Sequence, residues 1–237
     1  MIRQIYDFKD DKIRTMKDSL NKQSVSPEKR LLQARFSAIR KTTAEYLTQP
    51  FVQLLAKTRM TPNGLTWLGF GLTIGAATLI FSGYLFAAGF IVLAAGFLDM
   101  LDGALARGTN QVTRFGSILD STLDRMAEAV LFLSILAFYV LNANPHSTTT
   151  ILLAGIAMIT SFLVSYVRAR AEGTGLKCEV GLLTRAERVM VLVLGLLLSQ
   201  INYALIIALV IITILSLITV KQRLVYVWRQ ARKMDSF

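Results

Sequence analysis

Four aspartates in one short stretch of the chain have types and spacings suited to metal binding. Asp99 and Asp102 are three residues apart, and Asp120 and Asp124 are four apart. If both stretches are helical, each pair lies on one face of its helix. Because only a short connection separates the two stretches, we expect antiparallel neighbouring helices whose four carboxylates converge. Oxygen ligands of this kind favour Mg²⁺ or Mn²⁺ over zinc.

A convergent set of four carboxylates predicts chemistry on phosphate groups. The nearby Arg107, Arg114 and Arg125 are too few to neutralise such a set, whereas divalent cations can do so. Metal ions held by carboxylates bridge phosphate oxygens and orient an in-line attack, and a spare carboxylate can act as general base. The alternative is a purely structural set of salt bridges. The residues alone therefore indicate a metal-dependent enzyme that acts on a phosphate ester or anhydride.

The elements that position these aspartates lie in a membrane. The 237-residue chain has a net charge of +11, yet 54% of its residues are hydrophobic and its mean hydropathy is +0.52. Residues 66–98 and 189–220 contain no Asp, Glu, Lys or Arg. Such runs exceed the ~20 apolar residues that span a bilayer. The composition excludes disordered and ordinary soluble proteins. The positive charge therefore does not indicate a nucleic-acid-binding protein.

The hydropathy pattern predicts an all-α, polytopic protein with six transmembrane helices. The expected spans are residues 65–84, 86–106, 115–141, 149–168, 183–200 and 203–220. All 26 Lys and Arg residues fall at the termini, in the connections on one side of the predicted membrane, or in the parts of the spans that adjoin those connections. By the positive-inside rule, both termini and the aspartates should therefore face the cytoplasm.

The fifth predicted span is unusually short. Its uncharged part covers only residues 189–199, which cannot cross ~30 Å of hydrocarbon at ~1.5 Å per residue. The helix must begin earlier and carry Arg185, Glu187 and Arg188 into the cytoplasmic side of the membrane. These side chains either snorkel to the head groups or line a polar cavity, and their position alone does not decide between the two.

The predicted spans divide the chain into three regions. Residues 1–60 form a cytoplasmic extension that includes an amphipathic helix, 61–220 form the six-helix domain, and 221–237 form a basic cytoplasmic tail. A basic amphipathic helix beside the first span favours a position in the membrane interface. The alternative is a solvated helix packed on its own domain.

The aspartates belong to a longer pattern that resembles a known family. Residues 99–124 match D-x-x-D-G-x-x-A-R-x8-G-x-x-x-D-x-x-x-D, the signature of the CDP-alcohol phosphotransferases. The resemblance implies two divalent ions, Mg²⁺ with Mn²⁺ as a substitute, and it implies Asp124 as the base. The implied metal ligands are Asp99, Asp102, Asp120 and Asp124. The implied CDP-lipid contacts are Gly103, Arg107, Thr113 and the turn that contains Pro62, Asn63 and Thr66.

Two further segments resemble one branch of this family. Residues 165–175 and 181–188 are similar to phosphatidylinositol phosphate synthases of actinobacteria and archaea. This resemblance implies an acceptor-phosphate pocket of Arg168, Arg170 and Arg188, with Arg185 and Tyr166 as weaker candidates. Arginine suits this role because it binds phosphate in a bidentate manner. Positive-inside topology would, however, place arginines here whatever the acceptor.

The resemblance predicts an enzyme of phospholipid biosynthesis in the cell membrane, active as a homodimer. It would transfer a phosphatidyl group from CDP-diacylglycerol, or an archaeal analogue, to a phosphorylated alcohol such as inositol 1-phosphate, and release CMP. A phosphatidylglycerophosphate synthase, which uses glycerol 3-phosphate, would share every feature but the acceptor. A divalent-cation transporter would need polar residues across the membrane, and the outer halves of the predicted spans are uncharged.

Overall fold

The structure is a computed structural model that describes residues 49–52, 60–142 and 147–235. The chain divides into two units, residues 1–51 and 52–237, and the helices described below belong to the second. The predicted amphipathic helix of residues 1–60 falls almost entirely outside the described residues, so it stays a prediction.

Every regular element in the described part of the second unit is a helix, which confirms the all-α class. The helices are α3 (Pro62–Phe81), α4 (Leu85–Gly108), α5 (Arg114–Leu141), α6 (Ser147–Gly173), α7 (Arg185–Leu197) and α8 (Ala204–Asp235). Each falls on one predicted span. The largest difference is at α8, which continues through the basic segment beyond residue 220 as far as Asp235.

Four of the described helices are long and apolar enough to cross a membrane: α3, α4, α6 and α8. Helix α5 is long enough, but Asp124, Arg125 and Glu128 interrupt its apolar sequence. Helix α7 has only 13 residues. The structure therefore supports four spans directly.

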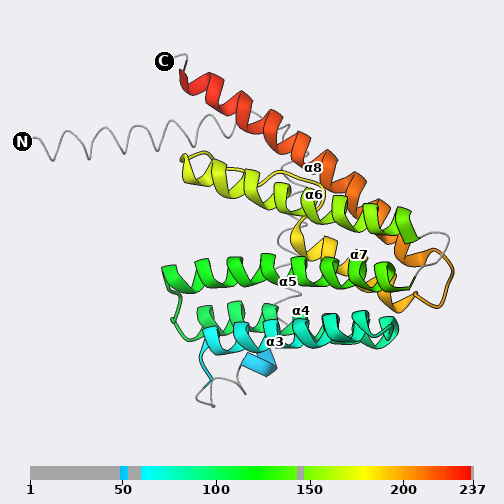
Figure 1. The fold of residues 1–237 in the computed structure, drawn as a ribbon. Coiled ribbons are helices and arrows are strands. Elements are labelled where there is room, and N and C mark those ends of the chain that lie inside the picture. Colours follow the sequence, from blue (N-terminus) through cyan, green and yellow to red (C-terminus); the bar gives the residue numbers. More distant parts are fainter. Residues whose placement is uncertain (1–48, 53–59, 143–146, 236–237) are drawn as a thin grey trace, which may run out of the picture. The chain divides into compact units, whose positions relative to one another are not determined.

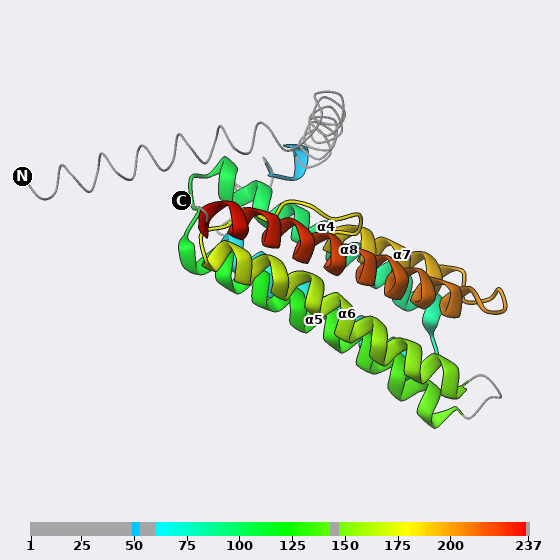
Figure 2. The same ribbon diagram turned by 90° about the horizontal axis from the view of Figure 1, so that it is seen from above.

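The helices pack side by side (Figures 1 and 2). Helix α3 packs against α4 and α5, α5 against α6, and α6 against α8. Helix α7 closes the arrangement, because it contacts both α4 and α8. Small residues permit this close packing: a Cβ on Gly195 of α7 would lie 2.6 Å from the Cβ of Ala208 in α8.

Apolar side chains occupy both the interior and the outer surface of the bundle. Ile80, Ile135 and Leu209 belong to a fully buried core that draws on every one of the six helices. By contrast, Phe90 and Leu152 are more than half exposed. Large exposed apolar side chains on outward faces are typical of helices that contact lipid.

Threonine caps fix the helix starts nearest the aspartates. The Thr61 hydroxyl accepts a hydrogen bond from the backbone N–H of Gly64 at 3.1 Å, and Pro62 occupies the first turn of α3. The Thr113 hydroxyl accepts one from Gly116 at 2.9 Å and so begins α5. At α7, the Glu187 carboxylate accepts a hydrogen bond from the backbone N–H of Thr184.

Candidate active site

Three of the four predicted carboxylates converge where α4 ends and α5 begins. Asp99 lies on α4, and Asp120 and Asp124 lie on α5. One oxygen from each of the three lies within 4.8 Å of the others, and all three residues are partly buried. The predicted convergence is thus present for three of the four aspartates, and α3 packs against both helices that carry them. The three-residue group is compact enough to share a cation.

Asp102 lies deeper than the other three aspartates. The residue is 5% exposed, and its carboxylate interacts with the side chain of Thr66 and the backbone of Gly103. Its Oδ2 atom is buried without a hydrogen-bond partner among the described residues. A buried carboxylate oxygen without a partner is costly unless a cation or water satisfies it. The oxygens of Asp99, Asp120 and Asp124 are donors that suit hard divalent cations, and Asp102 lies outside that compact group.

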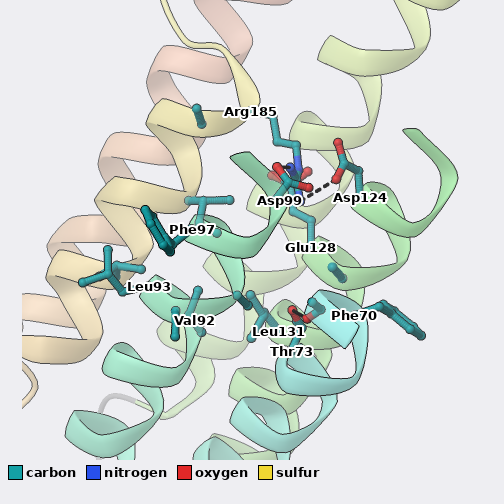
Figure 3. A pocket seen from close by; sticks show the side chains of 18 of the residues that line it. Phe70, Thr73, Val92, Leu93, Phe97, Asp99, Asp124, Glu128, Leu131 and Arg185 are labelled. Atoms are coloured by element: carbon teal, nitrogen blue, oxygen red, sulfur yellow. Dashed lines mark hydrogen bonds and ion pairs between the residues drawn. The ribbon is translucent and has the colours of Figure 1, made fainter. Parts of the chain in front are cut away.

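Arg185 makes direct contact with this carboxylate group. Its Nη1 atom is 2.8 Å from Oδ2 of Asp99, and its Nη2 atom is 2.7 Å from Oδ1 of Asp124. Figure 3 shows the guanidinium between the two acids, which come from different helices. These contacts were not predicted from the sequence, which indicated Arg185 as a weaker candidate for phosphate binding.

Arg188 forms a second ion pair one turn further along α7. Its Nε and Nη2 atoms donate to Oε1 and Oε2 of Glu128 at 2.7 and 3.0 Å. The two side chains are only 1% and 5% exposed. Glu128 is one helical turn beyond Asp124 on α5. Both arginines of α7 therefore pair with acids inside the bundle and do not snorkel.

The predicted CDP-lipid residues gather around the starts of α3 and α5. A Cβ on Gly116 would lie 2.9 Å from the Thr113 hydroxyl and 3.1 Å from Oδ1 of Asn63, so both side chains border this glycine. On α4, a Cβ on Gly103 would lie 3.3 Å from Nη1 of Arg107. A side chain at either glycine would occupy space next to these polar groups.

The other members of that set lie on the same helices. Pro62 is in the first turn of α3, and Thr66 one turn later donates its hydroxyl to the Pro62 carbonyl at 3.1 Å. Thr66 is also the residue whose side chain meets Asp102. The turn predicted to contact the nucleotide therefore adjoins the deepest aspartate.

The predicted acceptor-phosphate residues lie in different environments. Arg168 and Arg170 are exposed near the end of α6, as is Tyr166, and Arg168 pairs with Glu172 at 2.8 Å. Arg188 is buried by comparison and already paired. The structure shows no direct contact between the α6 arginines and Arg188 among the interactions it describes.

Sequence reasoning missed Arg223 of α8. This buried arginine donates hydrogen bonds to the carbonyl of Val180, at 2.8 Å, and to the carbonyl of Val164. The positive charges of Arg168 and Arg188 repel its guanidinium. The only sequence signal was an arginine just after a long uncharged run. Arg223 joins α8 to α6 and to the connection that leads into α7.

An apolar cavity of about 580 Å³ adjoins the carboxylates. Asp99, Asp124 and Arg185 lie at its polar end, and the lining continues along α4 to Leu93 (Figure 3). Helices α3, α5 and α7 supply the remaining walls. An ionic site next to an apolar cavity suits a ligand with a charged head and an apolar body.

Comparison with known proteins gives a consistent result. The sequence profile of CDP-alcohol phosphatidyltransferases matches residues 59–219. Phosphatidylinositol phosphate synthase of Mycobacteroides abscessus is 36% identical over 182 residues, 75% of this chain and 82% of the relative. Archaetidylinositol phosphate synthase of Methanothermobacter thermautotrophicus is 35% identical over 170 residues, 71% of this chain and 83% of the relative.

A solved structure shares the same fold. The crystal structure of Mycobacterium tuberculosis phosphatidylinositol phosphate synthase with CDP-DAG bound has a TM-score of 0.70 and 33% identity. It covers 77% of this chain and 94% of the solved chain. A second crystal structure of that enzyme, in complex with manganese and citrate, also has a TM-score of 0.70 and covers 76% and 88% of the two chains.

Proposed function

Because the chain belongs to the CDP-alcohol phosphatidyltransferase family, we propose that it transfers the phosphatidyl group of a CDP-linked lipid to inositol 1-phosphate and releases CMP. The observation that carries the proposal is the convergence of Asp99, Asp120 and Asp124 inside the region that the family profile matches. The names of the bacterial and archaeal relatives support a phosphorylated inositol as acceptor. Because one relative is archaeal, the proposed donor is either CDP-diacylglycerol or an ether-lipid analogue of it.

Two divalent cations, Mg²⁺ or Mn²⁺, complete the proposed site. Asp99, Asp102, Asp120 and Asp124 would hold them, which accounts for the unpaired buried oxygen of Asp102. The manganese-bound crystal structure of the tuberculosis relative supports this use of the site. When bound, the cations supply positive charge that neutralises a pyrophosphate and its leaving group.

The chain's own residues orient the reactants. Asn63, Thr113 and Arg107 lie around the small residues Gly103 and Gly116, where a nucleotide can approach the backbone closely. The apolar cavity next to the carboxylates receives part of the lipid, so the pyrophosphate lies at the polar end. This arrangement would place the reactive phosphorus next to Asp124.

Asp124 acts as the general base in this mechanism. Its carboxylate accepts the proton of the acceptor hydroxyl, whose oxygen then forms a bond to the phosphorus nearest the lipid. The bond between that phosphorus and the bridging oxygen of the pyrophosphate breaks, and CMP leaves with the bonding electrons. Three positive groups recognise the acceptor's own phosphate: Arg168, Arg170 and the one Arg188 nitrogen that Glu128 leaves unpaired.

The proposal places all six helices across the cell membrane, with both termini and the active site on the cytoplasmic side. Support comes from the one-sided distribution of Lys and Arg in the sequence. Helix α7 then brings its charged first turn to the depth of the aspartates. The ion pairs of Arg185 and Arg188 with acids offset the cost of burying these charges. We further propose a homodimer, as the family resemblance implies.

The mechanism is tested by Asp124→Asn in the purified protein. The variant should release no CMP above background from CDP-diacylglycerol and inositol 1-phosphate, yet bind the CDP-lipid about as well as the wild type. Asn is nearly isosteric with Asp but takes up no proton at neutral pH. Undiminished CMP release would disprove the assignment of Asp124 as base.

A further inference from the structure

We infer that Arg185 competes with divalent cations for Asp99 and Asp124, and so sets the metal affinity of the site. The inference rests on the proposed metal-dependent function and adds to it a cation supplied by the chain itself. Arg185 bridges two aspartates that the proposal assigns as metal ligands, with nitrogen–oxygen distances of 2.8 and 2.7 Å.

The contact geometry makes simultaneous occupancy unfavourable. The two terminal nitrogens of one guanidinium contact oxygens of Asp99 and Asp124, two of the three residues that each place one oxygen within 4.8 Å of the others. A divalent cation bound to the same aspartates would lie within a few ångströms of the guanidinium charge. In this partly buried site the repulsion is weakly screened. Metal binding and the two Arg185 ion pairs should therefore exclude each other.

Arg185 is well placed to leave the aspartates without movement of its helix. It is the first residue of α7, and its side chain is 28% exposed, so rotation of the side chain can carry the charge away from the two aspartates. Three residues later, Arg188 is 1% exposed and doubly hydrogen-bonded to Glu128 of α5. The buried pair holds α7 in place while Arg185 moves. The exchange is thus a side-chain event.

The functional consequence is a site whose negative charge is partly compensated when it holds no metal. Without Arg185, several carboxylates would face each other with less compensating charge. With Arg185 in place, a cation binds only to the fraction of molecules in which the side chain has moved away, and the apparent affinity falls by that fraction. Removal of the guanidinium should therefore tighten metal binding and destabilise the metal-free protein.

The experiment measures Mn²⁺ binding to the full-length protein in detergent, with free Mn²⁺ followed by electron paramagnetic resonance. Arg185→Gln should lower the apparent Kd about tenfold or more. Arg185→Lys keeps the charge but cannot bridge two carboxylates through one planar group, so its Kd should lie between the two. The matched control is Arg229→Gln, which removes the same charge from an exposed position on α8 and should leave the Kd unchanged.

Thermal unfolding gives a second readout. In EDTA, Arg185→Gln should unfold at a lower temperature than the wild type, and saturating Mn²⁺ should raise its midpoint by more than it raises that of the wild type. Unchanged or weaker Mn²⁺ binding in Arg185→Gln would overturn the inference. If that variant does not fold, an unchanged or weaker affinity in Arg185→Lys would overturn it equally. A wild type that binds no Mn²⁺ would instead refute the proposed metal site itself.

Discussion

The buried ion pair between Glu128 and Arg188 should make a large contribution to stability that depends on both partners. Glu128→Gln keeps the size of the side chain but removes the charge that neutralises the guanidinium. Arg188 is 1% exposed and Glu128 5% exposed, so water cannot replace the lost charge. Removal of one partner from a buried pair costs ~3–5 kcal/mol, and we expect Glu128→Gln to lose about that much unfolding free energy.

The chain offers a matched control for this prediction. Arg168 and Glu172 form an ion pair at 2.8 Å, nearly the same distance, but their side chains are 50% and 48% exposed. Because an exposed pair is worth only ~0–1 kcal/mol, Glu172→Gln should be nearly neutral. The comparison therefore sets a buried, doubly hydrogen-bonded pair against an exposed pair that makes one contact at a similar distance.

The assay is reversible unfolding in mixed micelles, followed by circular dichroism as the fraction of denaturing detergent rises. A further variant, Glu128→Leu with Arg188→Met, removes both charges and should regain most of the stability lost in Glu128→Gln. A loss below about 1 kcal/mol in Glu128→Gln, or one equal to that of Glu172→Gln, would refute the argument.

Three other predictions concern packing, thiol reactivity and metal dependence. Gly195→Ala should destabilise the protein by ~1–3 kcal/mol, because its Cβ would lie 2.6 Å from that of Ala208, whereas Gly155→Ala meets nothing within 4 Å and should be neutral in the same unfolding assay. The buried Cys178 should react with maleimide only after unfolding, because the residue is 0% exposed and burial raises the pKa of its thiol; rapid labelling of the native protein would contradict this. EDTA should abolish CMP release, and Mg²⁺ or Mn²⁺ should restore it; activity that persists in EDTA would contradict the metal assignment.

Much of the helical architecture could be predicted from the sequence because local patterns determine it. Long uncharged runs and the breaks between them located all six helices. The aspartate pairs at spacings of three and four indicated the convergence that brings Asp99, Asp120 and Asp124 together. Helix α8 continues beyond the predicted span, because the charged residues after Val220 mark a membrane boundary and do not break a helix.

The partners of the arginines could not be predicted in the same way. Arg185 is 86 residues from Asp99 in sequence, and Arg188 is 60 from Glu128. These pairs depend on the rotation of α7 about its axis and on its position relative to α4 and α5, and no local pattern determines either. The same holds for Arg223, whose hydrogen bonds reach carbonyl groups of two distant segments.

The most direct test of the account is CMP release by the purified protein with CDP-diacylglycerol, Mg²⁺ and a panel of alcohols. The panel should include inositol 1-phosphate, glycerol 3-phosphate and free inositol, and the lipid product should be identified by mass spectrometry. We expect CMP release with inositol 1-phosphate and a phosphatidylinositol phosphate product. CMP release only with glycerol 3-phosphate would contradict the proposed acceptor, and no release with any alcohol would contradict the proposed reaction.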